Sequence, residues 1–244
     1  MRSAGLFDTP GRRSYLSQMT KVMKKRGAAA NKKPGWLEVY GQLGLTRFAD
    51  KAAGRESQIL VGAFHCIAEM GIAATTTRAV ANRARLNQGS IHYYFRSKDE
   101  LLLGLLRGLR RNSADITRRI RDCALTPTEK LQCILKSGAT FIQTEELLVT
   151  ISLWAHAVAK GGIWRDTYRE LFDDIRANLI DIIDEGIALG EFSNTDSKAV
   201  AETIITAVQG IGMHYMMDPA DFAGESLSER LSGLFFKILG VKKL

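Results

Sequence analysis

The chain has 244 residues, of which 45% are hydrophobic and 25% are charged, so it is long enough to bury one or two hydrophobic cores. No apolar run approaches the roughly 20 residues that a membrane span needs, and the N-terminus lacks the apolar stretch of a signal peptide, so we expect a cytoplasmic protein. The three cysteines, Cys66, Cys123 and Cys133, lack metal-binding spacing. We interpret them as small buried hydrophobic residues, with redox sensing as the alternative.

A basic extension occupies residues 1–54. It contains 11 Lys and Arg against 3 Asp and Glu, whereas the rest of the chain carries equal numbers of both signs. Such an arm could follow a phosphate backbone or enter a minor groove, or it could be a solvated segment without fixed structure. Translation starting at Met19 or Met23 is a further alternative. Residues 36–43 are apolar enough to pack against a domain as a short helix.

Three helices are predicted in the next part of the chain. The first covers residues 55–70, places its apolar residues on one face and ends at Gly71. Two shorter helices joined by a tight turn follow, and the next helix is capped at Ser97. The apolar residues of the two short helices recur at helical spacing and should share a small core, namely Val80, Ala81, Ala84, Leu86, Ile91, Tyr94 and Phe95.

The sequence Ile-His-Tyr-Tyr-Phe at residues 91–95, followed by Ser-Lys-Asp-Glu-Leu at residues 97–101, resembles the TetR family of bacterial transcription regulators. In that family three N-terminal helices form the DNA-binding domain, and the second and third make a helix-turn-helix. A bare helix-turn-helix pattern is a weak signal, whereas this run is specific. The resemblance implies that residues 55–101 form a DNA-binding domain.

Two positions depart from the family pattern. Arg85 stands where the family usually carries Gly in the turn, and a left-handed backbone there would cost a non-glycine residue about 1–2 kcal/mol. We expect either a relaxed turn or a compensating contact of Arg85, for example with a phosphate. His92 stands where the family usually has Tyr, so a phosphate contact from this position would require a protonated imidazole.

Nine residues are predicted to contact DNA. Gln88 and Ser90 should face the groove, and Gln suits an adenine edge. Tyr93 should be exposed because Tyr94 and Phe95 take core positions, so its hydroxyl could reach a phosphate or its ring a thymine methyl group. The full set is Thr77, Arg78, Asn87, Gln88, Gly89, Ser90, His92, Tyr93 and Lys98.

Several members of this set have a second interpretation. Thr77 should cap the second helix and Asn87 the recognition helix, so capping alone is the alternative for both. Arg78 could reach a base edge or the DNA backbone, and Lys98 a phosphate, or both could be ordinary solvated charges. Gly89 would let the recognition helix approach DNA closely.

Helical patterns continue to the C-terminus without a convincing alternating strand, so the predicted fold is all-α with nine helices. The resemblance implies that residues 102–244 form a helical ligand-binding and dimerisation domain. The further helices are expected at residues 97–122, 126–144, 145–160, 164–189 and 196–217, and in a last helix capped by Ser226.

The last two helices carry apolar stripes. In the family that the chain resembles, these helices pair with their copies in a second subunit as a four-helix bundle. Packing within one chain is the alternative use of the same residues. The stripes consist of Val200, Ile204, Ile205, Val208 and Ile211, and of Leu227, Leu231, Leu234, Phe235 and Ile238.

Large or adaptable side chains in the bundle suggest a pocket for an unknown, largely apolar small molecule. Aromatic residues at helical spacing are also common in plain cores, and a buried His is more often paired within the protein. The candidate ligand-binding residues are Phe141, Trp154, His156, Tyr168, Phe172, His214 and Tyr215.

The resemblance therefore implies a ligand-responsive regulator, most often a repressor, that binds a palindromic operator as a homodimer. A small-molecule effector would tilt the helix of residues 97–122 and release the DNA. The alternative is a ligand-independent architectural DNA-binding protein that relies on its basic arm. An enzyme is not expected, and no cofactor or metal is predicted, because the sequence shows no nucleophile–base pair, phosphate-binding glycine loop or metal-ligand spacing.

Overall fold

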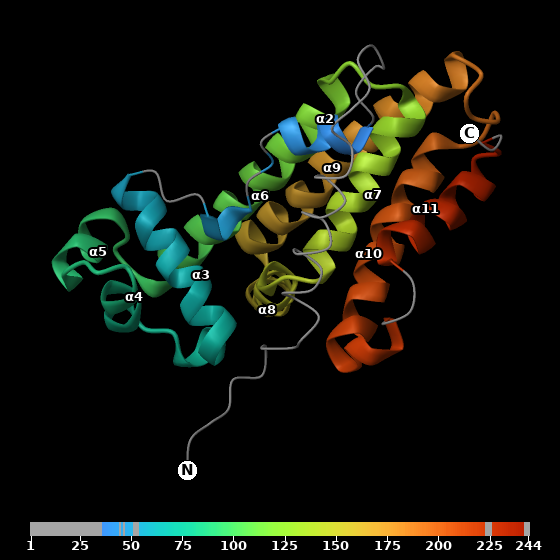
Figure 1. The fold of residues 1–244 in the computed structure, drawn as a ribbon. Coiled ribbons are helices and arrows are strands. Elements are labelled where there is room, and N and C mark those ends of the chain that lie inside the picture. The colour runs from blue at the N-terminus through green and yellow to red at the C-terminus, as the bar shows by residue number, and fades with distance from the viewer. Residues whose placement is uncertain (1–35, 44, 46, 51–53, 223–225, 242–244) are drawn as a thin grey trace, which may run out of the picture. The chain divides into compact units, whose positions relative to one another are not determined.

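The computed structural model describes residues 36–43, 45, 47–50, 54–222 and 226–241. All regular structure in these residues is helical, which confirms the predicted all-α fold (Figure 1). The basic clusters within residues 1–35 lie outside the described residues, so DNA contact by this arm stays a prediction.

The nine predicted helices are present as α3 to α11. The segment expected as a short apolar helix forms α2 (Trp36–Gln42), and two 3-10 helices occur, η1 (Phe48–Asp50) and η2 (Pro219–Phe222). The other helices are α3 (Arg55–Ala74), α4 (Thr77–Arg83), α5 (Gln88–Tyr94), α6 (Lys98–Asp122), α7 (Pro127–Ile142), α8 (Glu145–Lys160), α9 (Gly162–Ala188), α10 (Ser197–Met217) and α11 (Leu227–Ile238).

The predicted helix ends coincide with local hydrogen bonds. The Ser97 hydroxyl accepts from the Glu100 amide at 3.1 Å and so caps α6. The Glu100 carboxylate accepts from the Arg96 amide at 2.7 Å, one residue before the partner that a capping box would use. Gly71 has a φ of +76° and interrupts the helical backbone of α3 at the predicted stop.

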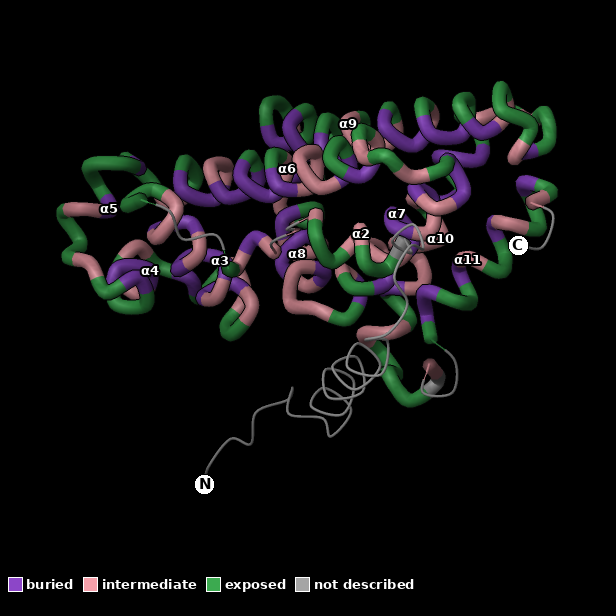
Figure 2. The backbone as a smooth tube through the Cα atoms, turned by 45° about the horizontal axis from the view of Figure 1, so that its top comes forward, coloured by how far each residue is buried: buried purple, intermediate pink, exposed green. Residues whose placement is uncertain are grey.

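Two hydrophobic cores divide the helices between them. Figure 2 shows the buried residues of the helices in purple. The first core joins α3, α4 and α5 to the first half of α6, to α8 and to the start of α9, and the second joins α7, α10 and α11 to the rest of α9. Most residues expected in the small core of the DNA-binding region are buried. Leu86 is only half-buried. The prediction for Tyr94 is wrong, because its ring is 38% exposed and packs edge-on against Tyr93.

The apolar stripes of α10 and α11 serve partly within the chain. Five stripe residues are buried in the second core, namely Val200, Ile204, Leu227, Leu231 and Phe235. Leu234 and Ile238 on α11 are 50% and 46% exposed. Intramolecular packing therefore accounts for one part of the stripes and leaves another part at the surface.

α3 is long and apolar enough to cross a membrane, with a mean hydropathy of 1.3 over an 18-residue window, so the expectation that no apolar run approaches that length is wrong for this helix. Its composition has a packing explanation. Ile59, Leu60 and Phe64 are buried in the first core. A side chain on Gly62 would lie 3.1 Å from the Cβ of Ala84, so α3 and α4 meet closely there. We therefore assign α3 as a core helix.

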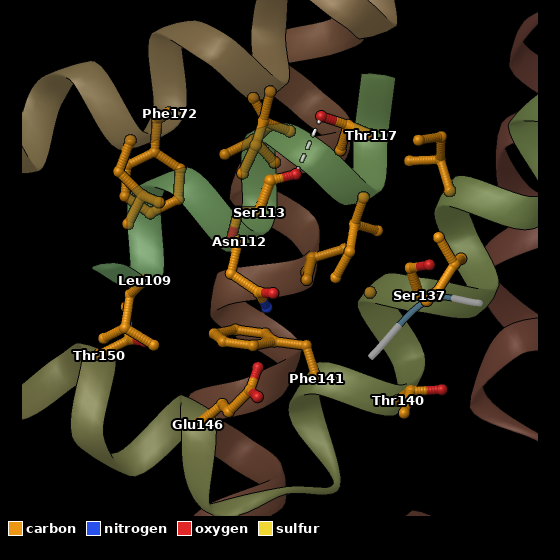
Figure 3. A pocket seen from close by; sticks show the side chains of 18 of the residues that line it. Leu109, Asn112, Ser113, Thr117, Ser137, Thr140, Phe141, Glu146, Thr150 and Phe172 are labelled. Atoms are coloured by element: carbon orange, nitrogen blue, oxygen red, sulfur yellow. Dashed lines mark hydrogen bonds between the residues drawn. The ribbon is translucent and has the colours of Figure 1, made fainter. Parts of the chain in front are cut away.

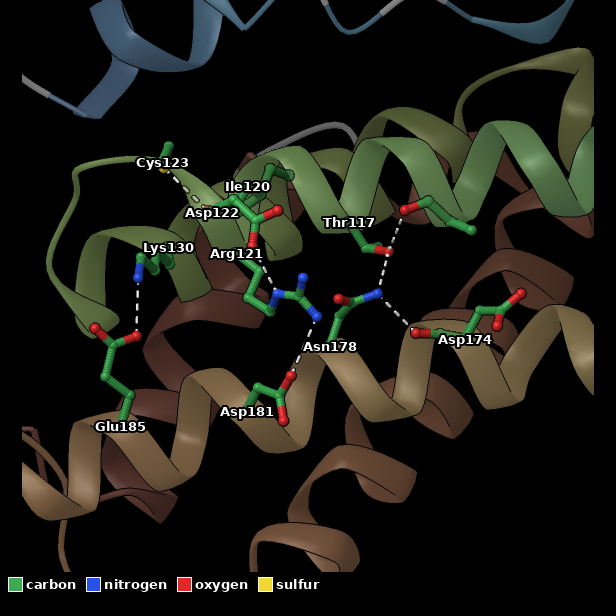
Figure 4. Close-up of polar contacts among 11 residues, drawn as sticks. Thr117, Ile120, Arg121, Asp122, Cys123, Lys130, Asp174, Asn178, Asp181 and Glu185 are labelled. Atoms are coloured by element: carbon green, nitrogen blue, oxygen red, sulfur yellow. Dashed lines mark hydrogen bonds and ion pairs between the residues drawn. The ribbon is translucent and has the colours of Figure 1, made fainter.

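Polar contacts join α6 to α9 (Figure 4). The buried Asn178 amide donates to the Thr117 hydroxyl at 3.1 Å. The Arg110 guanidinium pairs with Glu170 and, at 2.8 Å, with Asp174, and these carboxylates raise the pKa of Arg110. The ion pair Arg121–Asp181 (3.2 Å) also joins α6 to α9, whereas Lys130–Glu185 (2.8 Å) joins α7 to α9.

We expect Gly104→Ala to lower the free energy of unfolding by about 1–3 kcal/mol, although alanine favours a helix by about 1 kcal/mol. A Cβ at this position of α6 would lie 2.7 Å from the buried ring of Phe95, so the helix-turn-helix would have to shift. The matched control is Gly233→Ala in α11, where no atom lies within 4 Å, and it should stabilise the chain slightly. Denaturant unfolding of both variants makes the comparison, and equal stabilisation would contradict close packing at Gly104.

Candidate nucleic-acid interface and bundle cavity

The turn between α4 and α5 is held by side-chain caps. The Thr76 hydroxyl accepts from the Ala79 amide at 3.1 Å, so Thr76 caps α4 and the prediction of Thr77 as the cap is wrong. Asn87 caps α5 as predicted, because its Oδ1 accepts from the Ser90 amide at 2.7 Å. Thr77 is instead the first helical residue of α4, so its hydroxyl lies at the start of that helix.

The predicted DNA contacts are mostly solvent-exposed. Tyr93 is 83% exposed, and the side chains of Arg78, Asn87, Gln88, Gly89 and His92 are also exposed, whereas Thr77, Ser90 and Lys98 are half-buried. Gln88 lies within hydrogen-bond range of Thr77 (3.4 Å) and of His92 (3.5 Å), so these side chains form one polar strip across α4 and α5.

Two of these residues already have partners in the protein. The Ser90 hydroxyl donates to Asn87 Oδ1 at 2.9 Å. The Lys98 ammonium donates to the carbonyl oxygens of Ile72 (2.5 Å) and Ala73 (3.1 Å), near the C-terminal end of α3. An ammonium group has three N–H donors, so a phosphate contact by Lys98 would add to these bonds.

The surface around the turn is positively charged. Residues 71–98 contain 5 Lys and Arg and no Asp or Glu. Arg83 is paired with Glu69 at 2.7 Å. Arg85 has a φ of +54°, the one positive value for a non-glycine residue in the described part of the chain, so the turn is not relaxed. The Arg85 side chain is exposed on this basic surface, and its contact with a phosphate stays a prediction.

A cavity of about 180 Å³ lies within the helical bundle (Figure 3). Residues of α6, α7, α8, α9 and α10 line it, and the segment before α3 contributes Tyr40, Leu45 and Arg47. Phe48 of that segment is buried, and its amide donates to Glu146 Oε1 at 2.7 Å. Burial raises the pKa of Glu146.

Of the seven candidate ligand residues, Phe141 and Phe172 line this cavity. The other five do not line it. Trp154 is 49% exposed and His214 is also exposed. The remaining three pack elsewhere, with His156 against Trp164, Tyr168 in the first core, where burial raises its pKa, and Tyr215 against Phe222.

Sequence reasoning missed the polar residues of the cavity wall. Asn112 and Thr117 of α6, Glu146 of α8 and Gln209 of α10 all line the cavity. The signal for Asn112 was present, because it is a polar residue on the otherwise apolar face that runs through Leu105, Leu109, Ile116 and Ile120. The signal for Glu146 was weaker, since an acidic residue in the first turn of a helix is ordinary.

Two family models match the chain. Residues 59–105 match the bacterial regulatory proteins of the TetR family, and residues 127–234 match the C-terminal part of BetI-type transcriptional repressors. The HTH-type transcriptional regulator PksA of Bacillus subtilis (strain 168) is 32% identical over 170 residues, which are 68% of this chain and 80% of PksA. The chain belongs to the TetR family of DNA-binding transcription regulators, which are not enzymes.

Solved structures share the fold. A transcriptional regulator from Saccharomonospora viridis in complex with choline has a TM-score of 0.65 at 19% identity, covering 77% of this chain and 98% of that one. The transcriptional regulator FadR from Bacillus subtilis in complex with stearoyl-CoA has a TM-score of 0.61 at 20% identity, covering 78% of this chain and 100% of that one. These two regulators bind chemically different molecules with similar helical arrangements.

We expect Arg85→Gly to raise the free energy of unfolding by about 1 kcal/mol, because glycine relieves the positive φ. Arg85→Ala removes the charge but keeps the strain, so its stability should not rise. If Arg85 contacts a phosphate, both variants should bind DNA more weakly and with a shallower dependence on salt. Unfolding curves and salt titrations of DNA binding separate the two effects, and unchanged DNA affinity in both variants would contradict the phosphate contact.

Gly89→Ala should leave folding intact and weaken specific DNA binding about tenfold, corresponding to about 1.4 kcal/mol. Within the protein, a Cβ at Gly89 would meet only Asn87 Oδ1, at an ordinary 3.4 Å. A loss of affinity would therefore come from the space between α5 and DNA. The measurement is operator affinity alongside thermal unfolding, and an unchanged affinity would exclude a close approach at this residue.

Proposed function

We propose that this regulator is a repressor that binds a palindromic operator as a homodimer and is released by a small molecule in the bundle cavity. The observation that best supports this proposal is the position of α6. Its first half lies in the core of the DNA-binding helices, and Asn112 to Thr117 of the same helix reach the cavity wall. A ligand that changes the packing of α6 therefore acts on the DNA-binding helices directly.

The proposed domain organisation separates DNA binding from effector binding and dimerisation. Residues 55–101 would form the DNA-binding domain, and residues 102–244 the effector-binding and dimerisation domain. Thr77, Arg78, Gln88 and Tyr93 present exposed or half-exposed polar groups on one basic surface, which supports phosphate and base contacts. The remaining proposed contacts are Asn87, Gly89, Ser90, His92 and Lys98. Residues 1–54 would add a salt-dependent, non-specific contribution.

Coupling between the cavity and the DNA-binding domain would use two helices rather than one. The prediction singled out the helix of residues 97–122, yet α8 also packs against α3 in the first core. His65 on α3 lies 3.7 Å from Glu145 at the start of α8. At the other end of α8, Lys160 bonds Asp99 at 2.6 Å and lowers the pKa of Asp99. A ligand between α6 and α8 could therefore shift both of these helices, which pack against the DNA-binding domain.

We assign the dimer interface to the exposed apolar residues of α10 and α11. Met213 and Met217 on α10 are 56% and 82% exposed, and Leu234 and Ile238 on α11 are about half exposed. A second copy of the chain is the proposed partner, because a two-fold axis would place the two recognition helices on successive major grooves about 34–36 Å apart. Such a soluble regulator would act in the cytoplasm.

Selection of bound sequences from a random duplex pool tests the function. The full chain should enrich a palindrome, and Leu234→Glu with Ile238→Glu should shift the chain to monomers in sedimentation and abolish that enrichment. Ile163→Glu is the matched control, because Ile163 is 55% exposed but lies at the start of α9.

Three outcomes would count against the proposal. A dimer that persists in the double variant would move the interface elsewhere, and an enriched sequence without two-fold symmetry would contradict the palindrome. Equal affinity for random DNA, lost when residues 1–35 are removed, would favour the architectural DNA-binding protein instead.

A further inference from the structure

The segment before α3 closes one side of the cavity. Its helix α2 packs against α7, and the hydroxyls of Tyr40 on α2 and Ser137 on α7 bond each other at 3.1 Å. Both residues line the cavity, and so do Leu45 and Arg47 further along the segment. A molecule in the cavity is therefore bounded on this side by residues that precede the DNA-binding helices.

Contacts with the bundle hold this segment in place. The Arg119 guanidinium on α6 donates to the Leu43 carbonyl oxygen at 3.2 Å, and the Phe48 amide donates to Glu146 Oε1 at 2.7 Å. The Phe48 ring is buried against Gly108, where a Cβ would lie 2.8 Å from it. Because these contacts stand before and after the last two cavity-lining residues of the segment, the segment is a packed part of the wall.

The rest of the wall sets the polarity and the present size of the site. Its side chains are mainly apolar, among them Leu109, Ile116, Ile134, Leu171 and Ile175, and the cavity measures about 180 Å³. An apolar cavity of about 150 Å³ in another protein binds benzene, so a substituted benzene ring is the size of molecule that this cavity admits. Removing a wall side chain would make room for a longer molecule.

Two charged side chains line the cavity, and both have partners in the protein. Arg47 Nε donates to Asp50 at 3.2 Å within the segment, and Glu146 accepts from the Phe48 amide. An uncharged molecule leaves both of these contacts intact. Neutral compounds are therefore suited to measure the size of the site.

This wall lies outside the part of the chain that defines the family. The two family models match residues 59–105 and 127–234, whereas Tyr40, Leu45 and Arg47 precede both matches. The effectors of relatives are therefore a poor guide to the size of the effector here.

We propose that the described residues of the segment 36–50 limit the size of the effector, with Tyr40 and Leu45 setting the limit. This inference rests on the proposed function, since it concerns the same cavity. Each CH2 group that a ligand buries strengthens binding about fourfold, but only while the cavity has room for it. The longest molecule that binds well is thus determined by the side chains of this wall.

Para-alkylphenols of increasing chain length test the proposal, because they are neutral and differ only in the number of CH2 groups. Calorimetric titration of the full chain with the methyl, ethyl, butyl and hexyl compounds should show an affinity that rises and then falls once the molecule outgrows the cavity. Tyr40→Ala and Leu45→Ala each enlarge the cavity, so the strongest binder should become a longer phenol. The hexyl compound should bind these variants about tenfold more tightly than the unmodified chain.

Two control variants separate the size of the cavity from the stability of the segment. Tyr40→Phe removes the bond to Ser137 but keeps the ring, so the strongest binder should stay the same. Leu37→Ala shortens another side chain of α2, but Leu37 is 41% exposed and does not line the cavity, so the order of affinities should also stay the same. Thermal unfolding shows whether each variant folds, and Leu45→Ala decides if Tyr40→Ala does not fold.

The outcomes distinguish this inference from the proposed function. An unchanged length preference in both alanine variants would overturn the role of the segment and leave the cavity as the effector site. An affinity that keeps rising through the hexyl compound in the unmodified chain would overturn the size limit. Binding of none of the phenols would count against the cavity as an effector site and so against both. The expected shift in length preference, without any effect of the phenols on operator affinity, would support the role of the segment and count against ligand-controlled release.

Discussion

The structure depends most on the packing of α6 into two cores at once. Leu101 to Leu109 hold the helix against the DNA-binding helices, while Ile120 belongs to the second core. Close contact is possible because Gly104 and Gly108 leave room for the rings of Phe95 and Phe48. A well-packed interior transmits displacement instead of absorbing it, which supports the proposed coupling between the cavity and the DNA-binding helices. α8, which packs against α3, gives a second connection of the same kind.

The segment before α3 is part of the cavity wall. Tyr40, Leu45 and Arg47 line the cavity, and Phe48 is buried beside Gly108. The bond from the Phe48 amide to Glu146 ties this segment to the first turn of α8. The described end of the basic extension therefore forms part of the cavity wall. The prediction that the extension contacts DNA rested on its charge.

Similar helical folds hold different molecules in the solved structures. Regulators with similar helical arrangements hold stearoyl-CoA in one case and choline in another. The bundle supplies a space between helices, and the few polar groups on its wall decide which molecule gains a hydrogen bond there. In this chain Asn112, Glu146 and Gln209 are among the polar residues on that wall.

Local interactions made much of the structure predictable. The caps at Ser97, Thr126 and Asn87 form between residues three positions apart, so the sequence alone places these helix starts. The exposure of Tyr93 was predicted from the helical pattern, in which Phe95 takes a core position. Helical periodicity shows which face of a helix is apolar, but not which other element covers it. Tyr94 and Trp154 therefore looked like buried residues and are partly exposed, while Asn112, a polar residue on an apolar helix face, lines a cavity. That cavity exists only where five helices and the segment before α3 meet, so only the tertiary structure could decide which residues surround it.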